Sequence, residues 1–361
     1  MRILVVGAGT IGLPFGLVLS QMNHVVDFVD TCSKRIKGLQ DKTTYLEEPG
    51  LKELLVSSEN VTFSAEASQQ VVHDVVVFAV NLSTSVESIE ALYEQYSFQI
   101  KRSGLVLFRS TLNNHQWDKI SYSINSSSWA YIPERSRPGD ILNELRTLPQ
   151  IVGSESHEAF SKTHEIFNGL GCSLIETSVI EAIAIKLLTN AWRVSVFELG
   201  NSFFLECKER NLDFIKISEI AKKGYPRLES LPSPGFISGP CLPKDFSAWS
   251  QWNDKSIKNE FPLNTKLTQA FLAKLLGEFP ELQNKRIALW GNGYRVDLKD
   301  DRKSFSSILK KILNELGATV ECFSTIESDQ LSNWKADLVI NLFPTKSKQT
   351  DENVFNFWSG E

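Results

Sequence analysis

The chain has 361 residues, of which 42% are apolar and 22% are charged, the composition of an ordinary globular protein large enough for two or three domains. Its 38 basic and 43 acidic side chains give a net charge of -5, which argues against nucleic acid as the main partner. No apolar run is long enough to span a bilayer, so we expect no membrane partner. The opening "MRILVVGAGTIG" reaches glycines too soon for a signal peptide, and we expect a cytoplasmic protein.

The cysteines and histidines are scattered and lack metal-ligand spacing. We therefore predict no metal site, and reduced thiols. Four of the five cysteines are interpreted as small buried apolar residues. The fifth, Cys241, stands in "SPGFISGPCLPKD", residues 233–245, where glycines and prolines predict a shaped loop that presents the thiol.

The first part of the chain alternates apolar strands with helices. "RILVVGAGTIGLPFGLVLSQ" predicts a strand, a glycine turn and a helix, and further strands are expected at "HVVDFVD", "DVVVFAV", "GLVLFRS" and "WAYIP". This alternation is typical of a parallel sheet with helices on both faces. We predict an α/β fold with an N-terminal Rossmann domain over residues 1–175.

A helical segment follows, over residues 176–280. Residues 178–210 show helical periodicity without proline, which predicts one helix of about thirty residues; the alternative is two shorter helices that break near Gly200. The aromatic side chains of this helix exceed what a small helical domain buries, so we expect a homodimer built on it. These aromatic residues are Trp192, Phe197, Phe203 and Phe204.

The α/β pattern returns over residues 281–361, with strands expected at "RIALWG", "TVECFS" and "ADLVINLF". This pattern predicts a smaller, Rossmann-like C-terminal domain.

A glycine fingerprint, G-x-G-x-x-G, lies between the first strand and the first helix. Its glycines allow a tight turn, close approach of a pyrophosphate to the helix N-terminus, and helix–strand packing. Asp30 ends the next strand, where an acid accepts hydrogen bonds from a ribose 2′-OH and repels a 2′-phosphate. We therefore predict NAD as the cofactor. The residues assigned to it here are Gly7, Gly9, Thr10, Ile11, Gly12 and Asp30.

Lys186 and Asn190 are four residues apart on the predicted long helix and so share one face. They are either a solvent-directed lysine beside a capping asparagine or a donor pair that stabilises an oxyanion. In the second case Cys241 allows oxidation beyond an aldehyde, because a thiol adds to it and a second hydride loss leaves a thioester. Lys186 or Lys244 would favour the thiolate, and Asp245 and Glu134 could manage water and protons.

Taken together these motifs resemble the nucleotide-sugar 6-dehydrogenases of the UDP-glucose/GDP-mannose dehydrogenase family. The matching segments are "GAGTIG" with Asp30, "STL" at 110–112, "PERSRPG" at 133–139, "PQIVG" from 149, "KLLTNAWR" at 186–193, "YPR" at 225–227, "PGFISGPCLPKD" and "GNGYRVDLKDDRKS" at 291–304.

The resemblance implies a dimeric enzyme that oxidises the C6 alcohol of a nucleotide sugar to a carboxylate with two NAD+. It assigns Cys241 as nucleophile, Lys186 and Asn190 as the oxyanion pair, and Asp245 and Thr111 to the catalytic water. It also assigns Glu134 to thioester chemistry. Ser110 and Thr111 are added to the cofactor site. Residues assigned to the substrate are Glu134, Lys186, Asn190, Arg227 from the partner subunit, Gly235 and Arg302.

The chain departs from the family pattern in four places. Asn81-Leu82-Ser83 replaces a Pro-Thr-Pro, Asn113-Asn114-His115 replaces a Pro-Gly segment, Ile183 replaces a glutamate, and Ser238 replaces a glycine. Two other functions stay open: a two-electron β-hydroxyacid-type dehydrogenase, which also uses a lysine and an asparagine four apart, and a catalytically silent protein that binds a nucleotide sugar. The motifs do not separate UDP-glucose from a UDP-N-acetylhexosamine.

Overall fold

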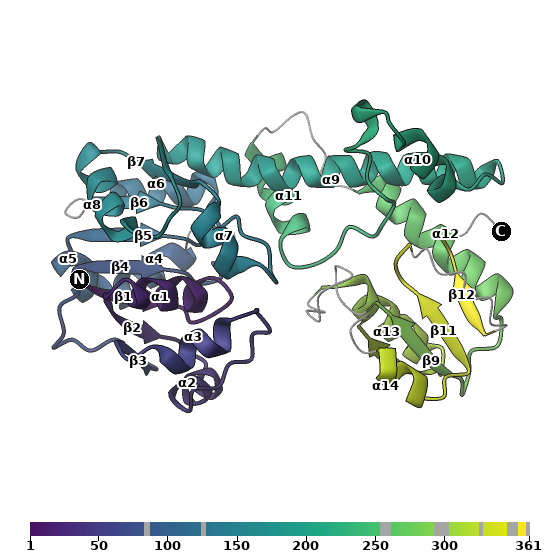
Figure 1. The fold of residues 1–361 in the computed structure, drawn as a ribbon, viewed down its shortest axis with the longest axis horizontal. Coiled ribbons are helices and arrows are strands. Elements are labelled where there is room, and N and C mark those ends of the chain that lie inside the picture. Colours follow the sequence, from purple (N-terminus) through teal and green to yellow (C-terminus); the bar gives the residue numbers. More distant parts are fainter. Residues whose placement is uncertain are drawn as a thin grey trace. The chain divides into compact units, whose positions relative to one another are not determined.

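The computed structural model describes residues 1–82, 87–123, 128–252, 261–291, 303–324, 328–344 and 353–358. The chain forms two compact units, Met1–Leu188 and Thr189–Glu361, whose elements are labelled in Figure 1. The division into residues 1–175, 176–280 and 281–361 stays a prediction.

The first unit is built on one eight-stranded sheet with the order β3-β2-β1-β4-β5-β6-β7-β8. Neighbouring strands are parallel except for the β6–β7 pair, which is antiparallel. The predicted Rossmann sheet is therefore confirmed, with β3, β7 and β8 as strands that the periodicity did not predict. The strands are β1 Arg2–Val6, β2 Val25–Val29, β3 Val61–Ser64, β4 Val75–Phe78, β5 Leu105–Phe108, β6 Ser128–Tyr131, β7 Gln150–Ser154 and β8 Leu174–Thr177.

Helices cover this sheet, and its central strands are buried throughout. Alternate side chains of β1, such as Ile3 and Val5, join a core with Leu13 and Phe15 of α1, whereas Leu4 points to the opposite face and is also buried. Burial on both faces explains why these strands are continuous apolar runs. The helices are α1 Gly12–Gln21, α2 Ser33–Gln40, α3 Leu51–Ser57, α4 Glu87–Gln95, α5 Ser97–Arg102, α6 Asn114–Ser123, α7 Ile141–Thr147 and α8 His157–Phe167.

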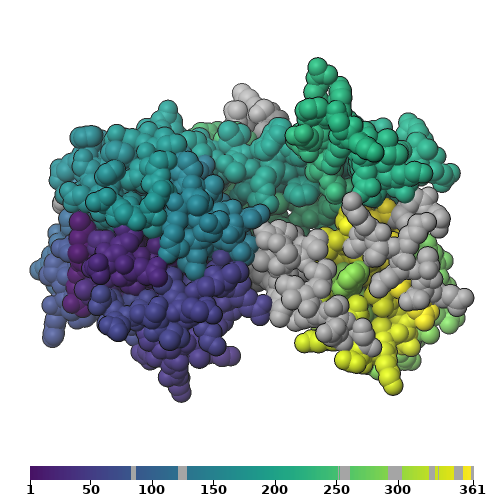
Figure 2. Space-filling view, viewed as in Figure 1, coloured from purple at the N-terminus to yellow at the C-terminus, as the bar shows by residue number. Residues whose placement is uncertain are grey.

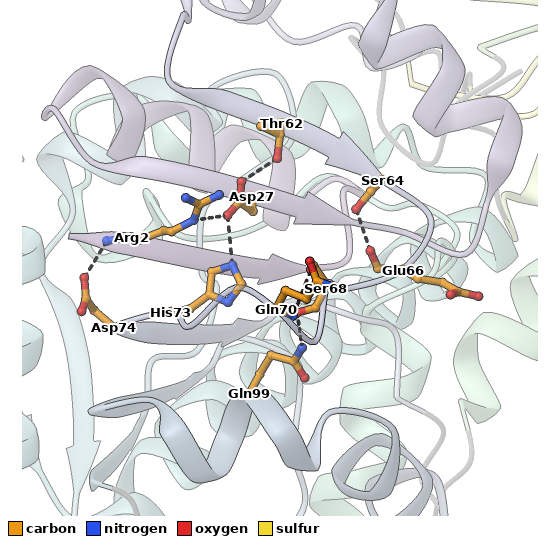
Figure 3. Close-up of polar contacts among 10 residues, drawn as sticks. All are labelled: Arg2, Asp27, Thr62, Ser64, Glu66, Ser68, Gln70, His73, Asp74 and Gln99. Atoms are coloured by element: carbon orange, nitrogen blue, oxygen red, sulfur yellow. Dashed lines mark hydrogen bonds and ion pairs between the residues drawn. The ribbon is translucent and has the colours of Figure 1, made fainter.

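A polar cluster around Asp27 ties neighbouring strands of this sheet together (Figure 3). The Asp27 carboxylate accepts hydrogen bonds from Arg2 Nε at 2.6 Å and Thr62 Oγ1 at 2.6 Å, and lies 3.0 Å from His73 Nε2. Burial alone would raise the pKa of Asp27, but these partners together hold it well below its usual range. The cluster therefore stabilises the sheet while Asp27 is ionised.

Helix α9 runs without interruption from Val179 to Glu209, so the single long helix is confirmed and the break near Gly200 is wrong (Figure 1). A capping box begins it: Glu181 accepts from the Ser178 N–H at 3.0 Å, and the Glu181 N–H donates to Ser178 Oγ at 3.3 Å. Gly200 has a packing role instead, because a Cβ there would lie 2.9 Å from Pro232 Cγ.

The second unit contains further helices and a small parallel sheet with the order β10-β9-β11-β12. The three predicted C-terminal strands are confirmed as β9, β10 and β11. The strands are β9 Arg286–Trp290, β10 Thr319–Phe323, β11 Leu338–Asn341 and β12 Val354–Asn356. The helical elements are α10 Phe214–Lys222, the 3-10 helix η1 Pro226–Leu228, α11 Leu242–Trp252, α12 Pro262–Glu278, α13 Phe305–Glu315 and α14 Ser328–Asn333.

Candidate active site

The predicted site residues of the first unit lie where parallel strands end. Gly7 follows β1, Asp30 follows β2, Ser110 follows β5 after one residue, and Glu134 lies three residues beyond β6. Because β1 and β4 are neighbours from which the chain continues in opposite directions, this edge is the switch point where α/β sheets bind ligands.

Of the three glycines of the loop, Gly9 alone has open space where a Cβ would lie. Gly7 has a φ of +99°, and a Cβ there would lie 2.6 Å from Ala79 O; a Cβ on Gly12 would lie 1.9 Å from Gly7 O. Both glycines are therefore required by packing. A Cβ on Gly9, by contrast, would meet nothing within 4 Å. The backbone at Gly9 is thus open to a pyrophosphate, and α1 has no acidic residue in its first turn to repel it.

Asp30 lies against this loop. Its carboxylate accepts from the Ala8 N–H at 2.9 Å, from the Cys32 N–H at 2.9 Å and from Arg35 Nη1 at 2.6 Å. Sequence reasoning did not identify Arg35, whose guanidinium also lies over the Tyr45 ring. The sequence signal for Arg35 was a basic residue five positions after Asp30, the acid predicted to bind the ribose.

Glu134 is buried and held by a cation that sequence reasoning also missed. Its carboxylate accepts from Arg109 Nη2 at 2.5 Å and from the Ser136 N–H at 2.7 Å. Burial raises the pKa of Glu134, but the Arg109 charge and these hydrogen bonds bring it below its usual range. Lys186 Nζ donates to the main-chain oxygen of Glu134 at 2.7 Å. Arg109 could have been noticed, because it is the one charged residue of the apolar stretch "GLVLFRS".

The second unit carries Asn190, Cys241 and Asp245. The exposed Cys241 immediately precedes α11, and its carbonyl accepts the Asp245 N–H at 2.9 Å. The predicted loop over 233–245 is therefore wrong at its end, since Leu242 to Asp245 are helical. Pro243 in the first turn of α11 was the signal, because proline is tolerated there.

Asn190 and Asp245 are bonded to each other. Asn190 Nδ2 donates to Asp245 Oδ2 at 2.6 Å, and both side chains are buried. Lys244 Nζ lies 3.6 Å from Asp245 Oδ1. This bond joins the long helix α9 to the first turn of the helix that Cys241 precedes.

The remaining predicted residues have varied surroundings. Ser110 is buried and donates to Phe78 O, and Thr111 is half-buried. Arg227 is exposed in η1, and its Nη1 donates to the Tyr225 hydroxyl at 3.1 Å. A Cβ on Gly235 would meet nothing within 4 Å. Arg302 lies outside the described residues.

Two departures from the family pattern have structural explanations. Asn113 starts α6 with a capping box: its N–H donates to Gln116 Oε1 at 3.2 Å, and the Gln116 N–H donates to Asn113 Oδ1 at 2.9 Å. Ile183 is fully buried in place of the glutamate. Ser83 lies outside the described residues, and nothing in the structure explains Ser238.

Residues 1–170 match the sequence profile of the NAD-binding domain of the UDP-glucose/GDP-mannose dehydrogenase family. Residues 1–170 therefore form a domain of the kind that this family uses to bind NAD. The resemblance and NAD as the cofactor are thereby confirmed.

Relatives of this dehydrogenase family extend the match beyond the NAD-binding domain. The chain is 29% identical over 339 residues to the UDP-N-acetyl-D-mannosamine dehydrogenase of Methanococcus maripaludis strain C7, covering 89% of this chain and 79% of the relative. Its fold is similar to a UDP-N-acetylmannosamine dehydrogenase of Pyrococcus horikoshii (TM-score 0.81, 22% identity, 95% and 89% of the two chains). It is also similar to a UDP-glucose dehydrogenase of Pyrobaculum islandicum (TM-score 0.79, 18% identity, 94% and 89%).

In the described part of the chain, no helix combines the length and apolar character needed to cross a membrane. Among the same residues, no three histidine, cysteine, aspartate or glutamate side chains are grouped as metal ligands.

Proposed function

We propose that this protein oxidises the C6 alcohol of a UDP-sugar to the carboxylate with two NAD+. The observation that carries the proposal is the Asn190–Asp245 hydrogen bond of 2.6 Å. It links the helix that carries Lys186 and Asn190 to the helix turn preceded by an exposed cysteine. A simple alcohol dehydrogenase has no need of that cysteine.

In the first oxidation, bound NAD+ supplies the hydride acceptor. Lys186 and Asn190 stabilise the negative charge on the C6 oxygen as its proton is lost. Helical spacing supports their joint action, because residues four apart lie on the same helix face.

In the second oxidation, the Cys241 thiolate adds to the C6 aldehyde and forms a thiohemiacetal. Loss of a second hydride leaves a thioester, and water then breaks the carbon–sulfur bond and regenerates the thiol. Glu134, kept ionised beside Arg109, accepts a proton from this water, while Thr111 and Asp245 orient it. One alcohol, two NAD+ and one water thus give one carboxylate, two NADH and three protons.

The proposed substrate is UDP-N-acetyl-D-mannosamine, with UDP-glucose as the competing UDP-sugar. The first choice rests on the name of the 29% identical relative, which covers most of both chains. The open backbone at Gly235 supports close approach of a sugar to the segment before Cys241. The cytoplasmic location stays a prediction.

The protein is further proposed to be a homodimer. Leu188, Trp192, Leu199 and Phe203 form one exposed stripe along α9, with Trp192 64% exposed. Ile217 and Ile220 add exposed apolar surface on α10, in the part of the chain that is green in Figure 2. Such an area favours a second copy as its partner, and Arg227 would then reach the partner's substrate.

The deciding experiment supplies purified enzyme with NAD+ and a panel of UDP- and GDP-sugars. It measures the NADH formed per molecule of product and identifies the product by mass spectrometry. Wild type is expected to form two NADH per carboxylate. Cys241→Ala should lose carboxylate and Cys241→Ser should stall after the first oxidation, while the control Cys207→Ala behaves as wild type.

Other results would select the alternatives. One NADH per product, or full carboxylate formation by Cys241→Ala, would favour the two-electron dehydrogenase. Tight binding of NAD+ and sugar without turnover would favour the silent binding protein.

A further inference from the structure

The ten residues before Cys241 have no regular secondary structure. A segment of this kind does not hold a side chain in place by its own hydrogen bonds. The groups that bond to it therefore determine where Cys241 lies.

Asn201 of α9 makes the most complete of these contacts. Its Nδ2 donates to the Gly235 carbonyl at 3.0 Å, and its Oδ1 accepts from the Gly235 N–H at 2.9 Å. The Asn201 residue is fully buried, so these bonds do not compete with water. One amide side chain thus satisfies both main-chain groups of Gly235.

Neighbouring contacts support the same segment. The Ile237 N–H donates to Asn264 Oδ1 at 2.7 Å, and the Gly239 N–H donates to the Lys303 carbonyl at 2.8 Å. Glu198, one turn before Asn201, fixes Asn264 by accepting its N–H at 2.8 Å. Asn201 is therefore the first of three successive contacts that lead towards Cys241.

Helix α9 also holds the chain after Cys241, through the hydrogen bond between Asn190 and Asp245. Asn190 and Asn201 are eleven residues apart, which is close to three helical turns, so they share one face of α9. One helix face thus bonds to the chain on both sides of the thiol.

We propose that Asn201 is a positioning residue for the thioester chemistry. Its two hydrogen bonds to Gly235, called the Gly235 clasp below, place Cys241 for attack on the substrate. The inference rests on the proposed function only for the role of Cys241. Misplacement of a reacting group by about 1 Å can cost about 100-fold in rate. Loss of the Gly235 clasp is therefore expected to lower kcat by about 10- to 100-fold, with the KM for NAD+ unchanged, because the cofactor residues lie in the other unit.

Three variants and a control test this inference. Asn201→Ala removes both bonds. Asn201→Asp keeps the acceptor but places a charge beside the Gly235 carbonyl. Gly200→Ala keeps the amide but pushes on Pro232, 2.9 Å from the added Cβ, while alanine favours the helix. The control Ser195→Ala removes a hydroxyl that bonds only within α9, to Ala191 O.

The pH dependence separates positioning from a general loss of stability. In Asn201→Asp, the protonated carboxyl group can donate to the Gly235 carbonyl again, whereas the ionised carboxylate repels it. The kcat of Asn201→Asp relative to that of Asn201→Ala should therefore rise as pH falls. Gly200→Ala should lower kcat, and Ser195→Ala should match wild type in both kcat and Tm.

The alkylation rate of Cys241 by iodoacetamide, followed by peptide mass spectrometry, is a readout independent of turnover. It should change several-fold in Asn201→Ala and stay unchanged in Ser195→Ala, because loss of the two bonds to Gly235 moves the segment that leads to the Cys241 thiol. Wild-type kcat and alkylation rate in both Asn201→Ala and Gly200→Ala would overturn the inference. If no sugar is oxidised, the proposed function fails, but the alkylation rates still decide the role of Asn201.

Discussion

The buried ion pair between Arg109 and Glu134 gives the most specific prediction about the stability of the first unit. The Arg109 side chain is 0% exposed and that of Glu134 is 10% exposed, and their closest atoms are 2.5 Å apart. Arg109 Nε and Nη1 are buried without a hydrogen-bonding partner among the described residues, although the guanidinium lies over the Phe15 ring. Glu134 is thus the one hydrogen-bonding partner of this guanidinium in that part of the chain.

Removing either partner leaves an uncompensated buried charge, which typically costs about 3–5 kcal/mol. Arg109→Met and Glu134→Gln should each lower the free energy of unfolding by about that amount. The double variant should lose much less than the sum, because it buries neither charge. The control Arg135→Met removes one bond to the Pro149 carbonyl and should cost only about 1 kcal/mol.

The pH dependence has a definite sign. The depressed pKa of Glu134 means that the pair contributes stability above the unfolded carboxyl pKa, about 4.3. This contribution is lost as pH falls through the folded value. Without Arg109, burial dominates and the pKa rises, so the destabilisation by Arg109→Met should be larger at pH 7 than at pH 4.

Hydrogen exchange of peptides from β5 and β6 would measure these effects for the first unit alone. Urea unfolding of the whole chain is less direct, because two compact units need not unfold in one step. Additive losses in the double variant, or a destabilisation by Arg109→Met that is equal at both pH values, would refute the reasoning.

Four other predictions concern the cofactor site, the Asp27 cluster and the dimer. Asp30→Ala should raise kcat/KM for NADP+ relative to NAD+, because it removes the repulsive carboxylate and leaves Arg35 available for a 2′-phosphate; an unchanged ratio would contradict the placement of Asp30 at the ribose. The wild-type free energy of unfolding should fall below about pH 4 as Asp27 protonates, and a curve equally steep in Asp27→Asn would be inconsistent with this. Trp192→Glu should shift sedimentation from dimer to monomer, and mixing Arg227→Ala with Cys241→Ala subunits should restore activity if Arg227 acts across the dimer; a wild-type monomer would exclude both.

Much of the first unit was predictable because its signals are local. The apolar residues of "RILVVGAGTIG" predict a buried strand, and its glycines predict a tight turn. The position of Asp30 beside this turn was predictable because it ends the next strand. The helix over residues 178–210 was predictable for the same reason, because its helical periodicity depends only on residues within that segment. The cysteine loop was chemically recognisable from its prolines and glycines, although Pro243 already marked the start of α11.

Only the tertiary structure decided which distant groups meet. Arg109 and Glu134 are 25 residues apart, and Asn190 and Asp245 are 55 apart, so no periodicity connects them. The sequence predicted one long helix but left a break near Gly200 open as an alternative, and only the contact with Pro232 explains why a glycine stands inside a continuous helix. Asn201 gave no local signal at all, because an asparagine becomes a clasp only when folding brings both main-chain groups of Gly235 within hydrogen-bonding distance. Residue type and spacing determined the chemistry available to this protein, and burial with its hydrogen-bonding demands decided how those groups are paired.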